Sequence, residues 1–269
     1  MKKASLLLVV IALAATVFAQ EAVTAAVLAQ KVQKDTQVAT QGTDTCQSTF
    51  SSGNGVSYMQ FCTTQNGNIS TFQSPSQNQL YHGAEGYGLC DATNGNVGYY
   101  DWGIYGDSEN WQDATITQPN GPNTFPLTIT RTSSDGTWTL KQVFTRNTTI
   151  PSLKITMTLK NNSGVTRQVY LERFADIDAD GTSGSNRFDA DQFGAWGHLD
   201  HGLMMRATTD VAISGGGIVA AGSMDPCHPT FKIIPYTGDG AVMYEWPFTA
   251  GKAIAPQASR TAIFEYRAF

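Results

Sequence analysis

Charged residues are scarce in this sequence. They make up 14% of its 269 residues, whereas soluble proteins carry about 25%. Positive charge is the scarcer kind, with 17 Lys and Arg against 22 Asp and Glu and a formal net charge of −5. A nucleic-acid binder needs a basic surface to displace counterions, so this balance argues against nucleic acid as a partner. The 41% hydrophobic content is too high for a disordered chain.

Several sequence signatures of chemistry are also missing. No Cys-x-x-Cys pair occurs, which leaves a structural zinc site or a covalently attached haem without support. There is no Gly-x-Ser-x-Gly elbow, and the four histidines lie near no Ser or Cys that would complete a catalytic triad. After residue 44 no stretch of ten or more residues keeps a period of 3.6, so we expect no long helix there.

Long apolar runs are confined to the N-terminus. Lys2 and Lys3 precede an apolar stretch at residues 6–15, and small or aliphatic residues stand at the −3 and −1 positions of a cleavage site. This layout predicts a signal peptide over residues 1–19, cleaved after Ala19. The apolar run is shorter than the roughly 20 residues that span a bilayer. We therefore expect a secreted protein, periplasmic or extracellular, that is not embedded in a membrane once the leader is removed.

The cysteines form an even set, which in an oxidising compartment predicts two disulfides. They are Cys46, Cys62, Cys90 and Cys227. We favour Cys46–Cys62, which would tie a hairpin rich in Gly, Ser and Asn, and Cys90–Cys227, which would join the ends of the main domain. The spacing alone leaves the other two pairings open.

From Cys46 onward, short apolar runs separated by Thr, Ser, Asn and Gly recur about every ten residues. This spacing is typical of an all-β protein. We expect one antiparallel β-sandwich domain over residues 45–269, with two packed sheets and long loops. Residues 20–44 contain no aromatic residue and predict an N-terminal arm or linker, either a short helix or a flexible lead-in.

Two hairpins are expected in the middle of the chain. Apolar residues alternate with Lys and Thr over residues 153–160, so one side of this strand faces a core and the other faces water. Turn residues at 161–164 precede a return strand at 168–174. A second hairpin joins residues 127–131 to residues 138–144 through an Asp-Gly turn. Further strands are expected at residues 203–207, 231–236, 242–246 and 261–269.

A short acidic turn has aspartate at its positions 1, 3 and 5 and glycine at position 6: Asp176, Asp178, Asp180 and Gly181. It resembles the first half of an EF-hand calcium loop, because the glycine lets the backbone fold back and bring three carboxylates round one point. Position 12 is Arg187, where the EF-hand has glutamate, so Asp189 or Asp191 would have to complete the site. We expect a structural calcium ion held by the three aspartates and Asp189. The alternative is a solvated turn with local hydrogen bonds.

A second polar cluster contains two histidines: His198, Asp200 and His201. Histidines this close bind zinc or copper in some extracellular proteins. The alternative is a set of ordinary polar residues at a strand end, with histidine hydrogen-bonded to the backbone. We favour the alternative because no third strong ligand is evident.

Residues 81–113 mix glycines, aromatic residues and acids, and we expect long ordered loops there. Aromatic rings stack on the apolar faces of sugars, while acids and amides bind the hydroxyl groups. The candidate glycan-binding residues are Tyr99, Asp101, Trp102, Tyr105, Asp107 and Trp111. The same residues would equally serve to cap the core of a sandwich.

Paired carboxylates would support glycoside chemistry at a separation of about 5–10 Å. The candidates are Glu85, Asp101, Asp107, Glu109, Glu172 and Glu245. Glu172 differs from the others because it falls within an expected strand beside Arg173. A buried Glu–Arg ion pair would explain it without catalysis.

Together these patterns favour a secreted, non-catalytic binding or cell-surface protein with structural calcium and an extracellular glycan as its partner. The first alternative is a carbohydrate-active enzyme, a glycoside hydrolase, lyase or epimerase-like protein, that uses loop carboxylates. The second alternative is a structural envelope or matrix component. Paired acids in one cleft would favour the enzyme, exposed aromatic residues would favour binding, and a long open edge strand would favour assembly.

Overall fold

The structure is a computed structural model. It describes residues 46–81, 84–103, 108–147, 150–182, 184–191, 194–207, 212–215, 225–228 and 235–269. The predicted signal peptide and N-terminal arm lie outside the described residues, as does most of the strand expected at 231–236. The described chain is antiparallel β-structure, which confirms the predicted all-β class. Short 3-10 turns at Gly55–Ser57, Ala92–Asn94 and Ala179–Gly181 join some of the strands.

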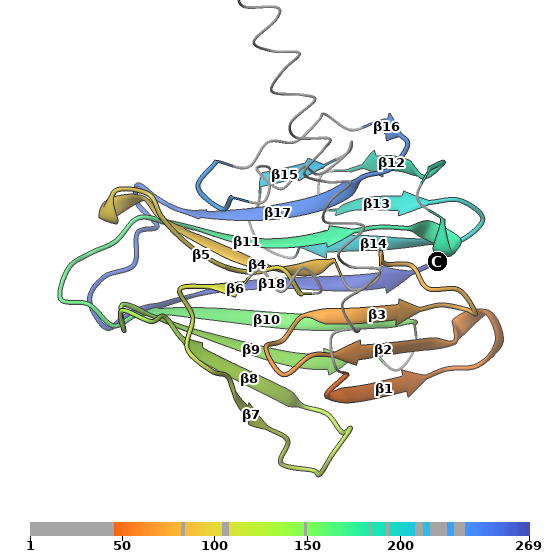
Figure 1. The fold of residues 1–269 in the computed structure, drawn as a ribbon, viewed down its shortest axis with the longest axis horizontal. Coiled ribbons are helices and arrows are strands. Elements are labelled where there is room, and N and C mark those ends of the chain that lie inside the picture. The colour runs from red at the N-terminus through yellow and green to blue at the C-terminus, as the bar shows by residue number, and fades with distance from the viewer. Residues whose placement is uncertain are drawn as a thin grey trace, which may run out of the picture.

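The described strands form three sheets, and the two larger ones pack face to face as a β-sandwich (Figure 1). The six-stranded sheet contains, in order, β15 (Ala212–Gly215), β17 (Ala241–Phe248), β11 (Val169–Asp176), β4 (Glu85–Asp91), β5 (Val97–Asp101) and β6 (Ser108–Glu109). The nine-stranded sheet contains β16 (Tyr236–Thr237), β12 (Arg187–Ala190), β13 (Gly194–His198), β14 (Gly202–Ala207), β18 (Ser259–Ala268), β10 (Ser152–Asn161), β9 (Trp138–Arg146), β8 (Leu127–Thr132) and β7 (Thr115–Thr117). The small sheet contains β1 (Ser48–Ser52), β2 (Met59–Thr63) and β3 (Ile69–Gln73).

The core lies between the two large sheets and is filled by alternate residues of their strands. The alternation predicted for residues 153–160 is confirmed on β10, whose fully buried apolar residues are Leu153, Ile155, Met157 and Leu159. Across the core, the ring centroids of Trp246 on β17 and Phe264 on β18 lie 5.8 Å apart. Full burial of a large apolar side chain contributes about 1.5–3 kcal/mol, so this alternation is the main reason that the sheets pack.

The hairpin predicted from residues 153–160 and 168–174 is wrong. β10 pairs with β9 and β18, whereas β11 lies in the other sheet between β4 and β17. Alternation shows which face of a strand is buried, but both sheets bury one face in the same core, so it does not decide which sheet a strand joins. The other predicted hairpin is confirmed by the pairing of β8 with β9, and the strands expected at residues 203–207, 242–246 and 261–269 are present.

The long loops expected at residues 81–113 are in large part strands, namely β4, β5 and β6. The glycines of β4 are needed because other chain segments pass close to it. A Cβ atom at Gly86 would lie 1.9 Å from the carbonyl oxygen of Asp101, and one at Gly88 would lie 2.8 Å from Trp102. Glycine in a strand interior marks such close approach, which composition alone does not distinguish from a loop.

Both favoured disulfides are present. Cys46 is bonded to Cys62, with Cα atoms 5.6 Å apart, and Cys90 is bonded to Cys227, with Cα atoms 4.9 Å apart. Structural disulfides of this kind are typical of proteins exposed to an oxidising compartment. None of the helical turns in the described part of the chain has the length and apolar character of a membrane span.

Candidate functional site

The outer face of the six-stranded sheet, which points away from the core, carries two glutamates opposite each other. Glu172 on β11 and Glu245 on β17 are direct partners in the antiparallel register. The Cβ atoms of such a pair lie about 4.5–5.5 Å apart. Because side chains alternate along a strand, Leu171 and Arg173 enter the core while Glu172 points outward. The sheet itself therefore places two carboxyl groups side by side.

Glu172 is fully buried, and neither of its carboxyl oxygens has a hydrogen-bond partner among the described residues. Burial, and then the negative charges of Glu245 and Asp225, hold the pKa of Glu172 well above its usual value. Burial also raises the pKa of Glu245, which is half-buried. The arrangement favours a proton on Glu172 at pH values where an ordinary glutamate is ionised.

A turn at residues 225–228 covers Glu172. A Cβ atom at Gly88, which lies opposite Glu172 on β4, would be 3.0 Å from Pro226, 2.8 Å from Trp102 and 3.1 Å from the Oε2 atom of Glu172. These three side chains therefore converge over a position where only glycine fits. The Cys90–Cys227 disulfide fixes the turn to β4, and the carboxylate of Asp225 accepts a hydrogen bond from the backbone N–H of Cys227 at 2.9 Å.

Aromatic rings lie beside the glutamates on the same face. The ring of Trp102 stacks on Tyr100, with centroids 5.8 Å apart, and meets Phe174 edge-on at 5.7 Å. Tyr100 and Tyr170 are half-buried, so part of each ring remains accessible. Accessible rings next to carboxyl groups form the kind of surface on which a sugar can stack while its hydroxyl groups are bound.

The expected glycan-binding residues do not form one surface in the described structure. Tyr105 and Asp107 lie outside the described residues. Tyr99, Asp101 and Trp111 are on the inner side of the sheet, where the Tyr99 hydroxyl donates to Asp135 at 2.9 Å, Asp101 pairs with Arg131 at 2.5 Å, and Trp111 packs against the core. Trp102 lies on the outer face. These residues are close in the sequence but do not share a surface, because alternate side chains along β5 point to opposite faces of the sheet.

The buried Glu–Arg ion pair considered as an alternative explanation of Glu172 does not form with Arg173. Consecutive residues of a strand point to opposite faces, so Arg173 lies in the core and pairs with Glu85 instead. Of the other carboxylates considered as catalytic candidates, Asp101 is bound by Arg131, and the side chains of Asp107 and Glu109 lie outside the described residues. Among the described candidates, only Glu172 and Glu245 face each other outside the core.

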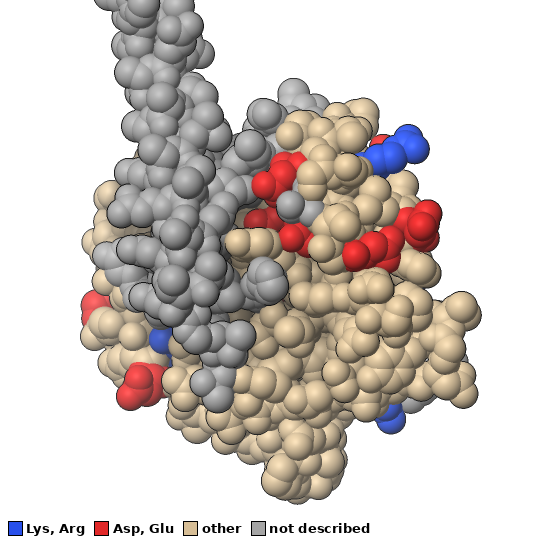
Figure 2. All heavy atoms as spheres, turned by 45° about the vertical axis from the view of Figure 1, so that its right-hand side comes forward, with Lys and Arg blue, Asp and Glu red and all other residues tan. Residues whose placement is uncertain are grey.

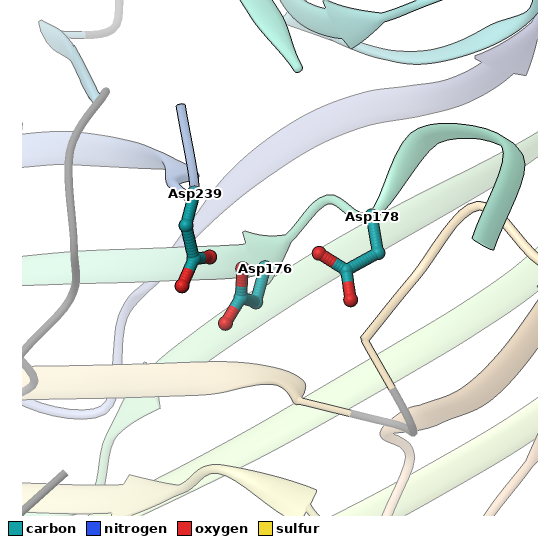
Figure 3. Close-up of side chains that lie close together, drawn as sticks. All are labelled: Asp176, Asp178 and Asp239. Carbon is teal, nitrogen blue, oxygen red and sulfur yellow. The ribbon is translucent and has the colours of Figure 1, made fainter. Parts of the chain in front are cut away.

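A cluster of aspartates lies where β11 ends. One carboxylate oxygen each from Asp176, Asp178 and Asp239 lies within 4.8 Å of the others. Figure 3 shows the three side chains in a row with Asp176 in the middle. Asp239 belongs to the connection between β16 and β17. The local sequence of the acidic turn does not indicate that Asp239 lies beside it. Such oxygen groups suit a hard divalent cation.

The other two predicted calcium ligands are engaged by histidines. Asp180 accepts hydrogen bonds from the backbone N–H and the Nδ1 atom of His201, at 3.0 and 2.8 Å, and Asp189 lies 3.3 Å from the Nε2 atom of His198. The two histidines thus bond to different aspartates. Figure 2, which turns the right-hand side of Figure 1 forward, shows acidic side chains gathered on the upper part of a surface that otherwise carries little charge.

The calcium site stays a prediction, and thermal unfolding checks it. If the aspartates bind Ca²⁺, calcium at 100 times its dissociation constant stabilises the protein by about 2.7 kcal/mol, or about 5–10 °C in the unfolding midpoint. Asp178→Asn should abolish this response, whereas Asp113→Asn, at an exposed carboxylate, should retain it. A midpoint indifferent to calcium and to EDTA would contradict the prediction.

Comparisons with known proteins show the fold. The sequence matches no protein-family profile and no curated protein. A bacterial glucoamylase complexed with acarbose is similar in structure, with a TM-score of 0.63 and 12% identity over 84% of this chain and 32% of the glucoamylase chain. A putative aldose 1-epimerase from Escherichia coli K12 has a TM-score of 0.51 and 12% identity over 82% of this chain and 99% of its own. The chain thus spans about a third of the glucoamylase and nearly the whole length of the epimerase.

Proposed function

We propose that this protein is a carbohydrate-active enzyme that carries out acid–base chemistry on a sugar, with Glu172 and Glu245 as the proton-transferring groups. The observation that carries the proposal is the buried carboxyl group of Glu172, which has no hydrogen-bond partner among the described residues and lies opposite a second carboxyl. Burying such a group costs stability, and groups with strongly shifted pKa values concentrate at functional sites. The fold shared with a glucoamylase and a putative aldose 1-epimerase supports a sugar as the substrate.

The two glutamates have different roles in this proposal. Glu172 holds a proton and donates it to the ring oxygen of an aldose, while Glu245, which reaches the surface, takes the proton of the anomeric hydroxyl. The bond between C1 and the ring oxygen breaks as the C1 carbonyl forms, and closure on the other face of the carbonyl returns both protons. The carboxyl groups lie on strands rather than on the loops that the sequence suggested.

Access to Glu172 requires movement of its cover. The side chain has no exposed surface, and Trp102 and Pro226 lie against it and its neighbour Gly88. A sugar therefore reaches Glu172 only when the side chains over it move aside, among them Trp102 and Pro226, the second of which belongs to the turn at residues 225–228. Tyr100 and Tyr170, beside this turn, then offer rings on which the apolar face of the sugar can stack.

The activity test measures interconversion of the anomers of glucose, galactose and mannose by proton NMR, with release of reducing ends from neutral glucans measured in parallel. Glu245→Gln should lower the rate by about 10²–10⁴-fold, the usual contribution of a positioned acid or base. Asp113→Asn, at an exposed carboxylate, should retain full activity. A wild-type protein without either activity, or a Glu245→Gln variant at full rate, would overturn the proposal.

Glu172→Gln separates loss of catalysis from loss of folding. In the wild type the folded-state pKa of Glu172 lies above the unfolded value, so the unfolded chain loses a proton that the folded chain keeps. Stability therefore falls as the pH rises above about 4.5 toward the folded pKa. The variant should be inactive, lack this slope, and melt about 2–4 °C higher at pH 7. The same slope in both proteins would show that the pKa of Glu172 is not raised.

A further inference from the structure

A groove lies on another part of the molecule, between the small sheet and the nine-stranded sheet. It has a volume of about 770 Å³, within the range of roughly 300–1,000 Å³ usual for small-molecule sites. Its walls come from β1, from the connection between β7 and β8, and from the end of β9. The groove is remote in the sequence from Glu172, and the proposed acid–base chemistry does not use it.

The walls of the groove are held in place by contacts within the protein. The side-chain oxygen of Asn123 accepts a hydrogen bond from the backbone N–H of Thr49 at 2.9 Å, which joins the β7–β8 connection to β1. The rings of Phe50 and Phe125 stack with centroids 4.4 Å apart. The side chain of Asn120 donates to the carbonyl oxygen of Phe125 at 2.7 Å. A site that is already formed needs little ordering when a ligand binds.

The charge of the groove is opposite to that of the protein. Arg146 is the one charged residue among the described residues that line it, and neither Asp nor Glu is among them, although the chain has a net charge of −5. No carboxylate in the described part of the chain lies within ion-pair distance of Arg146. The exposed guanidinium lies 6.0 Å from the ring centroid of Phe125 and donates only a long bond, 3.4 Å, to the carbonyl oxygen of Ser51.

The remaining lining groups are those that bind saccharides. The residues that line the groove together with Arg146 include four that carry hydroxyl groups: Thr49, Ser51, Thr124 and Thr145. Hydroxyl groups both donate and accept hydrogen bonds, as sugar hydroxyls require, and the half-buried ring of Phe125 supplies an apolar surface. A guanidinium binds planar or tetrahedral anionic oxygens with two parallel hydrogen bonds.

We propose that this groove is a binding site for an anionic sugar unit, with Arg146 holding its carboxylate or sulfate group. The hydroxyl groups and the ring of Phe125 then hold the sugar itself. The site recognises a charge that the carboxylate of Glu245, on the outer face of the six-stranded sheet, would repel. The protein thus has a second saccharide site with the opposite charge preference.

Isothermal titration calorimetry tests this proposal with three probes: trigalacturonate, its fully methyl-esterified form and a sulfated carrageenan tetrasaccharide. The esterified probe is the matched neutral ligand, because it differs from trigalacturonate only in its blocked carboxyl groups. Trigalacturonate, the sulfated probe or both should bind, with an affinity that falls as NaCl is raised, and the ester should bind at least about tenfold more weakly. The comparison of the two anionic probes distinguishes carboxylate from sulfate as the preferred group.

The protein variants locate the site. Arg146→Gln should weaken binding of the preferred anionic probe at least about tenfold and leave the ester unchanged. Arg146→Lys keeps the charge but loses the paired donors, so its affinity for the preferred anionic probe should lie between those of the wild type and Arg146→Gln. Arg187→Gln removes another exposed arginine and should bind as the wild type does. Three results would overturn the proposal. The first is that neither anionic probe binds at millimolar concentration, and the second is that trigalacturonate and its ester bind equally while the sulfated probe does not bind. The third is full affinity in a folded Arg146→Gln variant.

Discussion

Replacing Arg173 with methionine is expected to lower the free energy of unfolding by about 3–5 kcal/mol, the usual cost of removing one partner of a buried ion pair. Arg173 and Glu85 are fully buried between the sheets and form an ion pair. The guanidinium also donates to the side chain of Gln142 at 2.6 Å and to the carbonyl oxygen of Gly67 at 3.0 Å. The variant would leave a carboxyl group in the core without its cation.

The pH dependence of this defect follows from Glu85. Burial raises the pKa of Glu85, and the charge of Arg173 and the hydrogen bonds from Tyr266, Ile69 and Arg173 oppose that rise. Without Arg173 the folded-state pKa rises further above the unfolded value, so the variant keeps a proton that the unfolded chain loses. Its stability then falls more steeply above about pH 4.5 than that of the wild type, and the defect is larger at pH 8 than at pH 5.

Urea unfolding at the two pH values measures the effect. Arg173→Met combined with Glu85→Gln should recover part of the loss, because the second change removes the uncompensated charge. Arg187→Met, at an exposed arginine, should change stability by no more than about 0.5 kcal/mol. A loss in Arg173→Met as small as that of Arg187→Met would show that the pair does not stabilise the core.

The sequence predicted those features of the fold that depend on local patterns. The alternation in residues 153–160 identified the buried face of β10 correctly, and the Asp-Gly turn identified the β8–β9 hairpin. The partners of β10 and β11 were not predictable in this way, because strands of both sheets bury the same kind of face. The glycines at positions 86 and 88 indicated a loop, although they lie in a strand. Only glycine fits there because Asp101 and Trp102 pass close to the strand, and that contact depends on tertiary structure.

The candidate site shows the same limit. Glu172 was identifiable as an acid within a strand, and the sequence offered Arg173 as an alternative ion-pair partner, whereas the residue opposite Glu172 is Glu245 on the neighbouring strand. Asp239 reaches Asp176 and Asp178 from a distant connection. The sequence around Arg146 did not identify it as a binding residue, because its groove is formed by three separate segments of the chain. Each of these groupings depends on strand order, which a single sequence specifies only weakly.

Replacing Cys90 and Cys227 together with alanine is expected to lower the free energy of unfolding by about 4–5 kcal/mol. The disulfide joins residues 137 positions apart, and a cross-link that closes a long loop removes the most conformational entropy from the unfolded chain in the loop-closure account. The Cys46–Cys62 disulfide is the matched control, because its two residues are only 16 positions apart. Replacing Cys46 and Cys62 together with alanine should lower the free energy of unfolding by about 3 kcal/mol. Urea unfolding of the two double variants measures both effects.

Removal of Cys90–Cys227 should also change the titration of Glu172, because this disulfide fixes the turn whose Pro226 covers the buried carboxyl. Once water reaches Glu172, its pKa returns toward the ordinary value, and the destabilisation that the wild type accumulates above about pH 4.5 disappears. The difference in stability between the wild type and the Cys90→Ala/Cys227→Ala variant should therefore be larger at pH 5 than at pH 8. The Cys46→Ala/Cys62→Ala variant leaves Glu172 covered, so its difference from the wild type should be the same at both pH values. If the two disulfide variants show the same dependence on pH, the turn at residues 225–228 does not control the protonation of Glu172.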